Sequence, residues 1–243
     1  MRIRKGNPFN PFHLLFQGWK VLLWGVFILS LLFFLSQLNF SQYFPIRTIK
    51  VYGANRIDHQ EIQEMIQPLV RSGFFGINIE YIRDRLLQMP WISEIFVRRN
   101  WPDQLAIIIL EKHPVARWNG QHLLSEAGEI FLPKQETYPA NLPQFEGPEG
   151  KQMLMLQYFA EINRVLMPIH AKISDLELTP YSTWKLKLDN GITLQVGHKD
   201  ILTRLSHFVK VYPKIVGEHT TDVDYIDLRY SNGVAVRWKG ESV

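Results

Sequence analysis

One apolar stretch stands out from the rest of the chain, whose hydrophobic residues otherwise follow strand-like or helix-like spacings. No charged side chain occurs from Val21 to Asn39. A helix of about 20 residues is about 30 Å long, which matches the hydrocarbon core of a bilayer. Trp19 and Tyr43 lie at the two ends of the stretch, where interfacial aromatic residues are common. We therefore predict a single transmembrane helix over residues 19–38.

The charges around this stretch predict its orientation. Four basic residues precede it or lie at its start, namely Arg2, Arg4, Lys5 and Lys20. The next basic residue along the chain is Arg47. By the positive-inside rule, residues 1–18 form a cytoplasmic tail and the rest of the chain lies outside the cytoplasm. We expect a single-pass type II protein of the cell inner membrane with its C-terminus in the periplasm.

A cleaved signal peptide is the alternative to an anchor. Its apolar region would span only about 7–15 residues and would end at a small-x-small cleavage site. The apolar stretch here is longer, and Ser36–Phe40 contains no such site. An uncleaved anchor is therefore the better interpretation.

The first block after the anchor predicts an α+β module. Ile46–Tyr52 alternates as a strand, and apolar residues after Asp58 and again after Asn78 recur at helical spacing. Two further alternating strands follow, over Glu94–Arg99 and Leu105–Glu111. The order β-α-α-β-β allows two helices to cover one face of a three-stranded sheet.

Side chains at the ends of these elements are expected to cap the helices or to cover the sheet. Asp58 and Glu61 have the spacing of a capping box, in which Asp58 accepts the N–H of Glu61 and Glu61 reaches back. Asn78 is expected to cap the second helix. Trp91 and Trp101 are expected to pack over the ends of the sheet, because aromatic side chains usually serve packing.

The second block predicts a mostly antiparallel β domain with two helices. Asn-Gly pairs at Asn119, Asn190 and Asn232 indicate hairpin turns, because both residues tolerate positive φ. Strands are expected over Val115–Trp118, His122–Leu124, Ile130–Leu132, Ile173–Leu178, Trp184–Leu188, Thr193–Val196, Val223–Arg229 and Val234–Trp238. Helices are expected over Lys151–Met167, with Leu154, Tyr158, Ile162 and Val165 inward, and over Lys199–Tyr212, with Ile201, Leu205, Phe208 and Tyr212 inward. Residues 133–150 are rich in Pro, Gly and polar residues and are expected to form a loop.

Charge and cysteine content narrow the class of protein. The formal net charge is +4, from 27 Lys and Arg against 23 Asp and Glu, and it is accounted for by the four basic residues beside the anchor. Since the remainder is neutral and carries no basic stripe with interleaved aromatics, we expect no nucleic-acid binding. The chain has no cysteine, which excludes disulfides, thiolate zinc sites and cysteine nucleophiles.

A search for catalytic patterns gives none. The sequence has no Gly-x-Ser-x-Gly, no Walker loop, no Gly-x-Gly-x-x-Gly and no His-Glu-x-x-His. Asp222, Asp224 and Asp227 are the densest group of carboxylates, but alternation along a strand would put Asp227 on the face opposite the other two. We expect charges at a sheet edge there and no metal site. The sequence predicts a non-enzymatic protein without a cofactor.

Several sequence runs resemble a known family. In the first block these are Val51-x-Gly53, Pro90-Trp91-Ile92, Val97-Arg98-Arg99-x-Trp101-Pro102, Leu105-x-Ile107 and Glu111-x-x-Pro114-x-Ala116-x-Trp118. In the second they are Ala116-Arg117-Trp118-Asn119, Ala127-Gly128, Leu142-Pro143-x-Phe145-x-Gly147-Pro148, Trp184-x-Leu186-x-Leu188-x-Asn190, Arg204-Leu205-x-x-Phe208-Val209-x-x-Tyr212-Pro213 and Tyr225-x-Asp227-Leu228-Arg229-Tyr230-x-x-Gly233-x-Ala235-Val236. Together they resemble the FtsQ/DivIB family of bacterial cell-division proteins. The resemblance implies a POTRA domain at 45–114 and an FtsQ-type β domain at 115–243.

The resemblance also implies a function. Members of this family are divisome scaffolds at the division septum, which link early septal-ring proteins to the FtsB–FtsL complex and help control septal peptidoglycan synthesis. The β domain would bind FtsB and FtsL, and the POTRA domain would contact FtsK and other divisome proteins. Which POTRA edge recruits partners, the first strand or the second helix, stays open.

The family's FtsB contact lies at the last strand. By motif it falls on Arg229, Tyr230, Asn232, Gly233 and Val234. A sheet edge suits such a contact, because its unpaired N–H and C=O groups can accept another strand. Without the resemblance, the same residues would be interpreted as a packing tyrosine and an Asn-Gly turn.

This sequence departs from the family at one place. Relatives carry a basic pair just before the position of Trp184 that helps to hold acidic residues of FtsB, whereas Tyr181 and Ser182 stand there in this chain. A charge contact at these positions is therefore in doubt.

An alternative function is a POTRA-containing component of outer-membrane assembly or secretion. That class predicts tandem modules and a following β-barrel with strands of about 9–11 residues. The sequence predicts only one such module.

Overall fold

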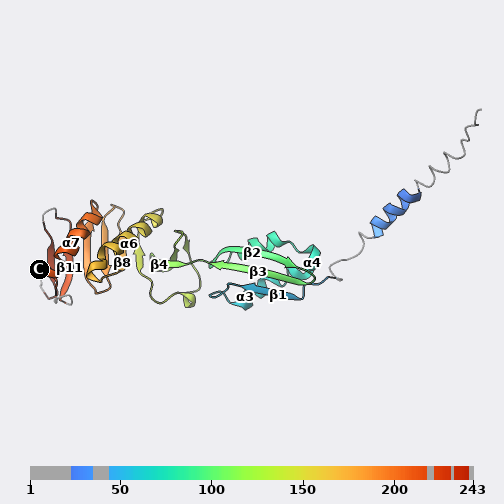
Figure 1. Cartoon of the computed structure of the whole chain (residues 1–243), viewed down its shortest axis with the longest axis horizontal. Helices are drawn as coiled ribbons and strands as arrows, with labels where there is room; N and C mark the ends of the chain where they lie inside the picture. Colours follow the sequence, from blue (N-terminus) through green and yellow to red (C-terminus); the bar gives the residue numbers. More distant parts are fainter. Residues whose placement is uncertain (1–22, 35–43, 218–221, 231–232, 241–243) are drawn as a thin grey trace, which may run out of the picture.

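The computed structural model of the chain describes residues 23–34, 44–217, 222–230 and 233–240. It contains two β-sheets, one of three strands and one of nine, which follow one another along the length of the molecule (Figure 1). Each sheet packs helices on one face, so the α+β class predicted from the sequence is confirmed.

The predicted membrane helix lies partly outside the described residues. Residues 23–34 are helical with exposed apolar side chains. No helix in the described part of the chain has both the length and the hydrophobicity needed to span a bilayer. The anchor over 19–38 therefore stays a prediction.

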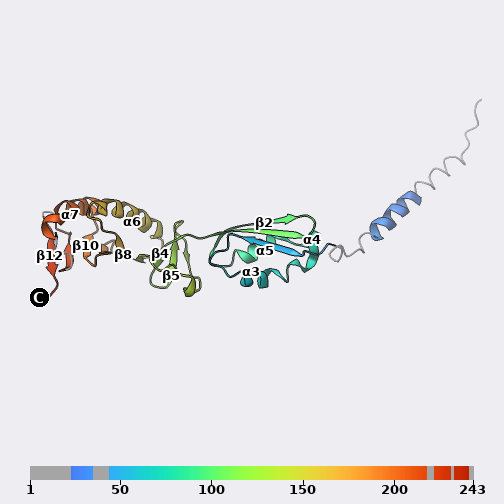
Figure 2. The same cartoon turned by 60° about the horizontal axis from the view of Figure 1, so that its bottom comes forward.

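The first sheet has the strand order β1-β3-β2. Its strands are β1 (Thr48–Tyr52), β2 (Ile92–Asn100) and β3 (Gln104–Glu111), with β1 parallel and β2 antiparallel to the central β3. The helices are α3 (His59–Ile66), the short α4 (Gly73–Gly76) and α5 (Ile79–Leu86), with a 3₁₀ turn at Val70–Ser72. The β-α-α-β-β order predicted from periodicity is confirmed. Figure 2 shows α3 and α5 on one face of this sheet.

The two helix caps differ in how well the sequence predicted them. Asn78 Oδ1 accepts the N–H of Tyr81 at 3.0 Å and caps α5 as expected. Asp58 caps α3, but it accepts the N–H of Gln60 at 2.9 Å. Glu61 does not complete a capping box, because its carboxylate is 2.9 Å from the Lys134 ammonium, far along the chain. A long-range ion pair has replaced the local interaction.

Gly53 ends β1 where no other residue fits. Its φ of +82° is in the left-handed region, and a Cβ added there would lie 2.1 Å from the carbonyl oxygen of Ile109 on β3. The close approach of two backbones therefore explains the glycine in the Val51-x-Gly53 run.

The second sheet has the strand order β12-β11-β10-β9-β8-β7-β4-β5-β6. Most neighbouring strands are antiparallel, and the pairs β4–β7, β7–β8 and β10–β11 are parallel. The strands are β4 (Pro114–Trp118), β5 (His122–Ser125), β6 (Ile130–Phe131), β7 (Gln144–Glu146), β8 (Ile173–Leu178), β9 (Trp184–Leu188), β10 (Thr193–Gly197), β11 (Val223–Asp227) and β12 (Ala235–Trp238). The helices α6 (Gln152–Leu166) and α7 (Ile201–Ile215) lie over one face (Figure 1).

Three expectations for this block were wrong in detail. Residues 133–150 are not all loop, since they contain β7, which is held by partners distant in sequence. Of the four residues predicted to face inward on α6, Ile162 is buried and Tyr158 and Val165 pack partly against the core, but Leu154 is exposed. Met155 and Leu166, which were not predicted, are buried. Helix α7 continues past Tyr212 and includes Pro213. Each error arises where tertiary packing overrides a local signal.

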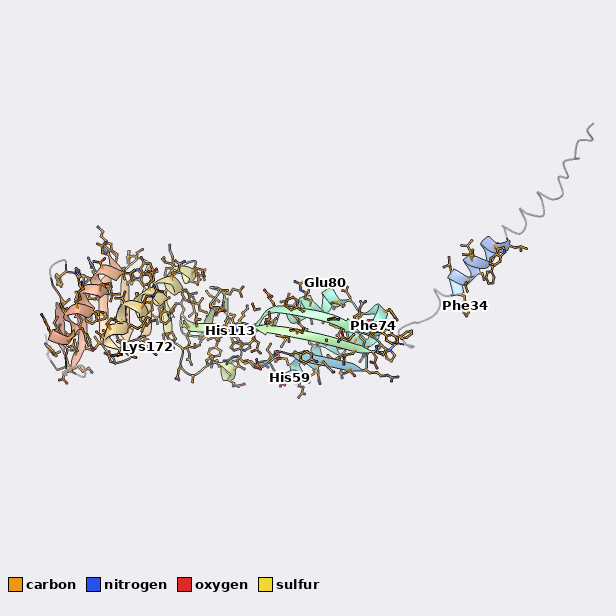
Figure 3. The ribbon with its side chains drawn as sticks, viewed as in Figure 1. Phe34, His59, Phe74, Glu80, His113 and Lys172 are labelled. Atoms are coloured by element: carbon orange, nitrogen blue, oxygen red, sulfur yellow. The ribbon has the colours of Figure 1, made fainter. Side chains whose placement is uncertain are left out.

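The first core continues into the second sheet. Trp91 is buried and packs edge to face on Phe131 of β6, with ring centroids 5.3 Å apart. Its indole N–H donates to Thr137 Oγ1 at 2.9 Å. Trp91 thus packs as predicted, whereas Trp101 is 73% exposed and the prediction for it was wrong. In Figure 3, His113 lies between the two sheets, at this junction.

Candidate partner-binding edge

The last strand of the chain is the open edge of the large sheet. β12 pairs antiparallel with β11 through Tyr225↔Arg237, Ile226↔Val236 and Asp227↔Ala235. No strand lies on its other side in the part of the chain that the structure describes. The predicted pairing of the last two strands is confirmed, and the outer strand is an edge that another chain could extend.

Two backbone hydrogen bonds indicate which N–H groups face outward. The Leu228 N–H donates to Gln195 O on β10, and the Lys239 N–H donates to Asp222 O beside β11. Because N–H directions alternate along a strand, the N–H groups of Ala235 and Arg237 point toward β11. The N–H group of Val236 then points to the open side, and by the same alternation so does that of Val234.

Arg229 is fixed at the end of β11 by Asp227. The guanidinium donates to the carboxylate from Nε at 3.0 Å and from Nη2 at 2.7 Å, and the Arg229 backbone N–H donates to the same carboxylate at 2.9 Å. This hydrogen bonding holds the pKa of Asp227 below its ordinary value and raises the pKa of Arg229. The chain leaving β11 toward Tyr230 therefore starts from a defined position.

Tyr230 is the exposed aromatic at this edge. Its side chain is 62% exposed, so it does not serve the core. Gly233 has open space around it, and Val234 packs partly against the core of the large sheet. Asn232 lies outside the described residues. Four of the five predicted site residues thus lie together at one end of the sheet, with Tyr230 free to contact a partner.

A groove runs beside this edge, under α7. It has a volume of about 800 Å³, and Leu228, Tyr230, Gly233 and Val234 line one side of it. α7 lines the other side, with Thr203, Arg204, His207, Lys210, Val211 and Ile215, and Asp200 lies at its start. Sequence reasoning missed this groove, because α7 was interpreted only by its buried stripe. The basic residues between the apolar positions of α7 were the available signal.

Arg204 braces the groove from within. Its Nη1 donates to the carbonyl oxygens of Val196 at 2.9 Å and Leu228 at 3.3 Å, which links α7 to β10 and to the end of β11. Gly197 has a φ of +90°, and a Cβ there would lie 3.1 Å from that Nη1 and 3.3 Å from Arg229 Cγ. His207 and Lys210 are exposed on the same helix. They are the basic groups of the groove that can face a ligand.

The turn that departs from the family lies at the same end of the sheet. Tyr181 and Ser182 connect β8 to β9, and Trp184 of β9 pairs with Gly197. Tyr181 is 89% exposed and Ser182 has a φ of +60°. The turn carries no positive charge toward the groove.

Asp224 and Asp227, near the hairpin, are each paired with an arginine. Asp224 Oδ2 is 2.7 Å from Arg237 Nη2, and Asp227 is bound by Arg229 as above. Within the described residues, no cluster of three or more His, Cys, Asp or Glu side chains could hold a metal ion. Burial raises the pKa of the Tyr225 phenol, which donates to Gln195 Oε1.

Comparison with known proteins places these features in a family. Residues 44–112 match the POTRA domain, FtsQ-type, and residues 116–229 match the family described as cell division protein FtsQ/DivIB, C-terminal. The chain therefore combines a POTRA module with an FtsQ-type C-terminal domain. Residues 230–234 lie beyond the second match, so that match does not include the proposed contact beyond Arg229.

Individual relatives agree with this class. The chain is 37% identical to the cell division protein FtsQ of Coxiella burnetii over 196 residues, which cover 80% of this chain and 81% of the relative. It is 32% identical to the FtsQ of Escherichia coli over 231 residues, covering 92% of this chain and 79% of the relative. The chain belongs to the FtsQ/DivIB family of cell-division proteins.

Proposed function

We propose that this protein is a non-enzymatic divisome scaffold that binds FtsB through the open edge of β12. In this proposal it links early septal-ring proteins to the FtsB–FtsL complex and so helps to control septal peptidoglycan synthesis. Family membership supports a role in cell division. The observation that carries the binding site is the outer edge of β12, beyond which no strand of the described residues lies, with the exposed Tyr230 beside it.

The edge and the groove would supply different parts of the interaction. Main-chain hydrogen bonds from Val234 and Val236 would set the register of an added partner strand. Tyr230 would supply a large aromatic contact at low conformational cost. The residues flanking the partner strand would lie along the groove, where Lys210 would provide the positive charge that Tyr181 and Ser182 lack.

The remaining features complete the proposal. Residues 19–38 would anchor the chain in the inner membrane with residues 1–18 in the cytoplasm, as the charge asymmetry predicts. The domain bounds would be 45–114 for the POTRA domain and 115–243 for the β domain. FtsK and other divisome proteins would contact the POTRA domain.

A titration tests the FtsB assignment. Full-length protein in lipid nanodiscs would be titrated with the periplasmic segment of FtsB, and the same measurement would be made on Tyr230→Ala and on Tyr52→Ala. Tyr52 is also an exposed tyrosine, but it lies on the small sheet. We expect Tyr230→Ala to weaken binding by about 2 kcal/mol, or roughly thirtyfold, and Tyr52→Ala to leave it unchanged. Equal affinities for parent and Tyr230→Ala, with circular dichroism showing both folded, would exclude this site.

A further inference from the structure

Three aromatic side chains gather at the end of the small sheet that is farthest from the large sheet. They are Phe44, just before β1, Phe75 in α4, and Trp101 in the β2–β3 turn, and we call them the aromatic tip. Phe75 is 56% exposed and Trp101 is 73% exposed. The rings of Phe44 and Phe75 meet edge to face, with centroids 5.2 Å apart. Figure 1 shows α4 at this end of the molecule.

Backbone hydrogen bonds hold the three segments of the tip together. The Phe74 N–H donates to Phe44 O at 2.8 Å, and the Arg47 N–H donates to Asp103 O at 2.9 Å. These bonds tie the segment before β1 to α4 and to the turn that carries Trp101. In Figure 3, Phe74 lies at the same end of the sheet. The tip thus draws on three separate parts of the chain that lie at one end of the small sheet.

The exposed rings are not explained by packing. Neighbouring Phe74 is buried and supplies the aromatic contact to the fold, with its ring centroid 5.3 Å from that of Phe75. Trp101 is the most exposed of the tip residues, although large aromatic side chains are usually buried or bound. Neither the β12 edge nor the groove under α7 includes the tip.

The length of the chain before Phe44 indicates what faces the tip. Only five residues separate Phe44 from Leu38, the end of the predicted membrane helix. A fully extended chain over this distance reaches about 20 Å. If the anchor holds, the tip must lie within that distance of the membrane surface. This step rests on the anchor of the proposed function.

The chemistry of the tip suits a lipid headgroup layer. Tryptophan side chains favour the interface between hydrocarbon and water. Two exposed cations lie at the same end, Arg47 before β1 and Arg71 just before α4, and arginine binds phosphate oxygens well. We propose that the aromatic tip docks on the phosphate-bearing headgroups of the membrane leaflet from which the chain emerges.

Docking at the tip would orient the whole molecule. The small and large sheets follow one another along the long axis, and the C-terminal end is opposite the tip in both views (Figures 1 and 2). The buried Trp91–Phe131 contact ties the two sheets together. A docked tip would therefore hold the β12 edge away from the membrane, where a periplasmic partner could reach it.

Fluorescence quenching tests the docking. The chain has no cysteine, so single cysteines introduced by Ser72→Cys, beside the tip, and Gln88→Cys, beyond α5, can each carry a bimane label without background. Full-length labelled protein would be placed in vesicles of phosphatidylethanolamine and phosphatidylglycerol that contain a lipid with a nitroxide headgroup. We expect stronger quenching at position 72 than at position 88.

The tether alone brings position 72 close to the membrane, so the decisive comparison is between variants. Phe75→Ala with Trp101→Ala should lower the quenching at position 72, because the tip no longer holds the surface. The matched control is Phe96→Ala with Ile108→Ala, which removes two exposed apolar side chains from the open face of the small sheet. The control should keep the quenching of the parent.

The outcomes separate the docking from the anchor. Flotation of the vesicles shows whether the chain is anchored. An anchored chain whose quenching at position 72 is the same in the parent and in the tip variant overturns the docking and leaves the anchor intact; a tip that binds another protein would give this result. A chain that does not float with the vesicles overturns the anchor and the docking together.

Discussion

The guanidinium of Arg229 and the carboxylate of Asp227 form a chelated pair at the end of β11, with Nη2 and Oδ2 2.7 Å apart. The Asp227 carboxylate is buried, whereas the Arg229 side chain is half exposed. The pair therefore fixes the end of β11, from which the chain continues to Tyr230. It makes the position of the proposed binding edge depend on one buried charge.

This pair predicts a pH dependence of stability. The pKa of Asp227 lies below its ordinary value of 3.8 in the folded protein, chiefly because Arg229 donates hydrogen bonds to it. A lowered folded-state pKa gives stability that is fully present above the unfolded pKa and is lost as the pH falls through the folded pKa. Urea unfolding between pH 7 and pH 2 should show this loss.

Asp227→Asn isolates the contribution of the pair. We expect it to cost about 1–2 kcal/mol at pH 7, since one partner is exposed and partly screened, and to flatten the acid dependence. Asp224→Asn is the matched control, because its pair with Arg237 is exposed on both sides. If Asp227→Asn unfolded at the same urea concentration as the parent at pH 7, the pair would not stabilise the fold.

The direction of the N–H groups on β12 predicts opposite effects for two proline variants. Val236→Pro removes an N–H that faces the open side, so it should weaken FtsB binding with little loss of stability. Ala235→Pro removes an N–H that faces β11, so it should destabilise the hairpin itself. Thermal unfolding and FtsB titration of both variants check this. Equal destabilisation by the two would contradict the register.

Replacement of Gly53 is predicted to lower the stability of the fold substantially. Gly53→Ala would place a Cβ 2.1 Å from Ile109 O, so the strands must move apart, and we expect a loss of about 2–4 kcal/mol. Gly120→Ala is the matched control, because Gly120 has a similar φ of +85° with open space around it. It should cost only about 1 kcal/mol, the price of the backbone conformation. Similar unfolding midpoints for the two variants would show that the clash is relieved.

At the contact between the two sheets, the buried ring of Phe131 is predicted to stabilise the fold more than the exposed ion pair of Lys134 does. Phe131→Ala removes a buried ring from Trp91 and should cost about 3 kcal/mol in denaturant unfolding. Lys134→Ala breaks an exposed ion pair with Glu61 and should change the unfolding midpoint little. A larger effect of Lys134→Ala than of Phe131→Ala would mean that charge holds the sheets together.

The sequence predicted the fold best where the pattern is local. Strands β8 and β9 begin and end at the predicted residues, because turn residues bound their alternating runs. The three-residue strand β7 could not be found, since it is held by β4 and β8 and not by its own pattern. The ion pair of Glu61 with Lys134 could not be predicted for the same reason, because the two residues are distant in the sequence.

The candidate site was likewise predictable from the sequence only in part. The hairpin and the exposed Tyr230 follow from the motif at 225–236, whereas the groove depends on α7 crossing over the end of β11. That crossing is fixed by Arg204, whose hydrogen bonds to Val196 and Leu228 have no counterpart in the sequence pattern. The exposure of Trp101 was also unpredictable from the sequence, because a tryptophan beside a turn fits either a covered or an open sheet end.

The most direct measurement of the central claim is amide hydrogen exchange of the full chain in nanodiscs, with and without saturating FtsB. Strand addition at the β12 edge predicts that the N–H groups of Val234 and Val236 become protected on binding. The N–H groups of Ala235 and Arg237, already paired with β11, should change less, and those of β6 at the other edge should not change. Unaltered exchange at Val234 and Val236 in a saturated complex would show that FtsB does not pair with this edge.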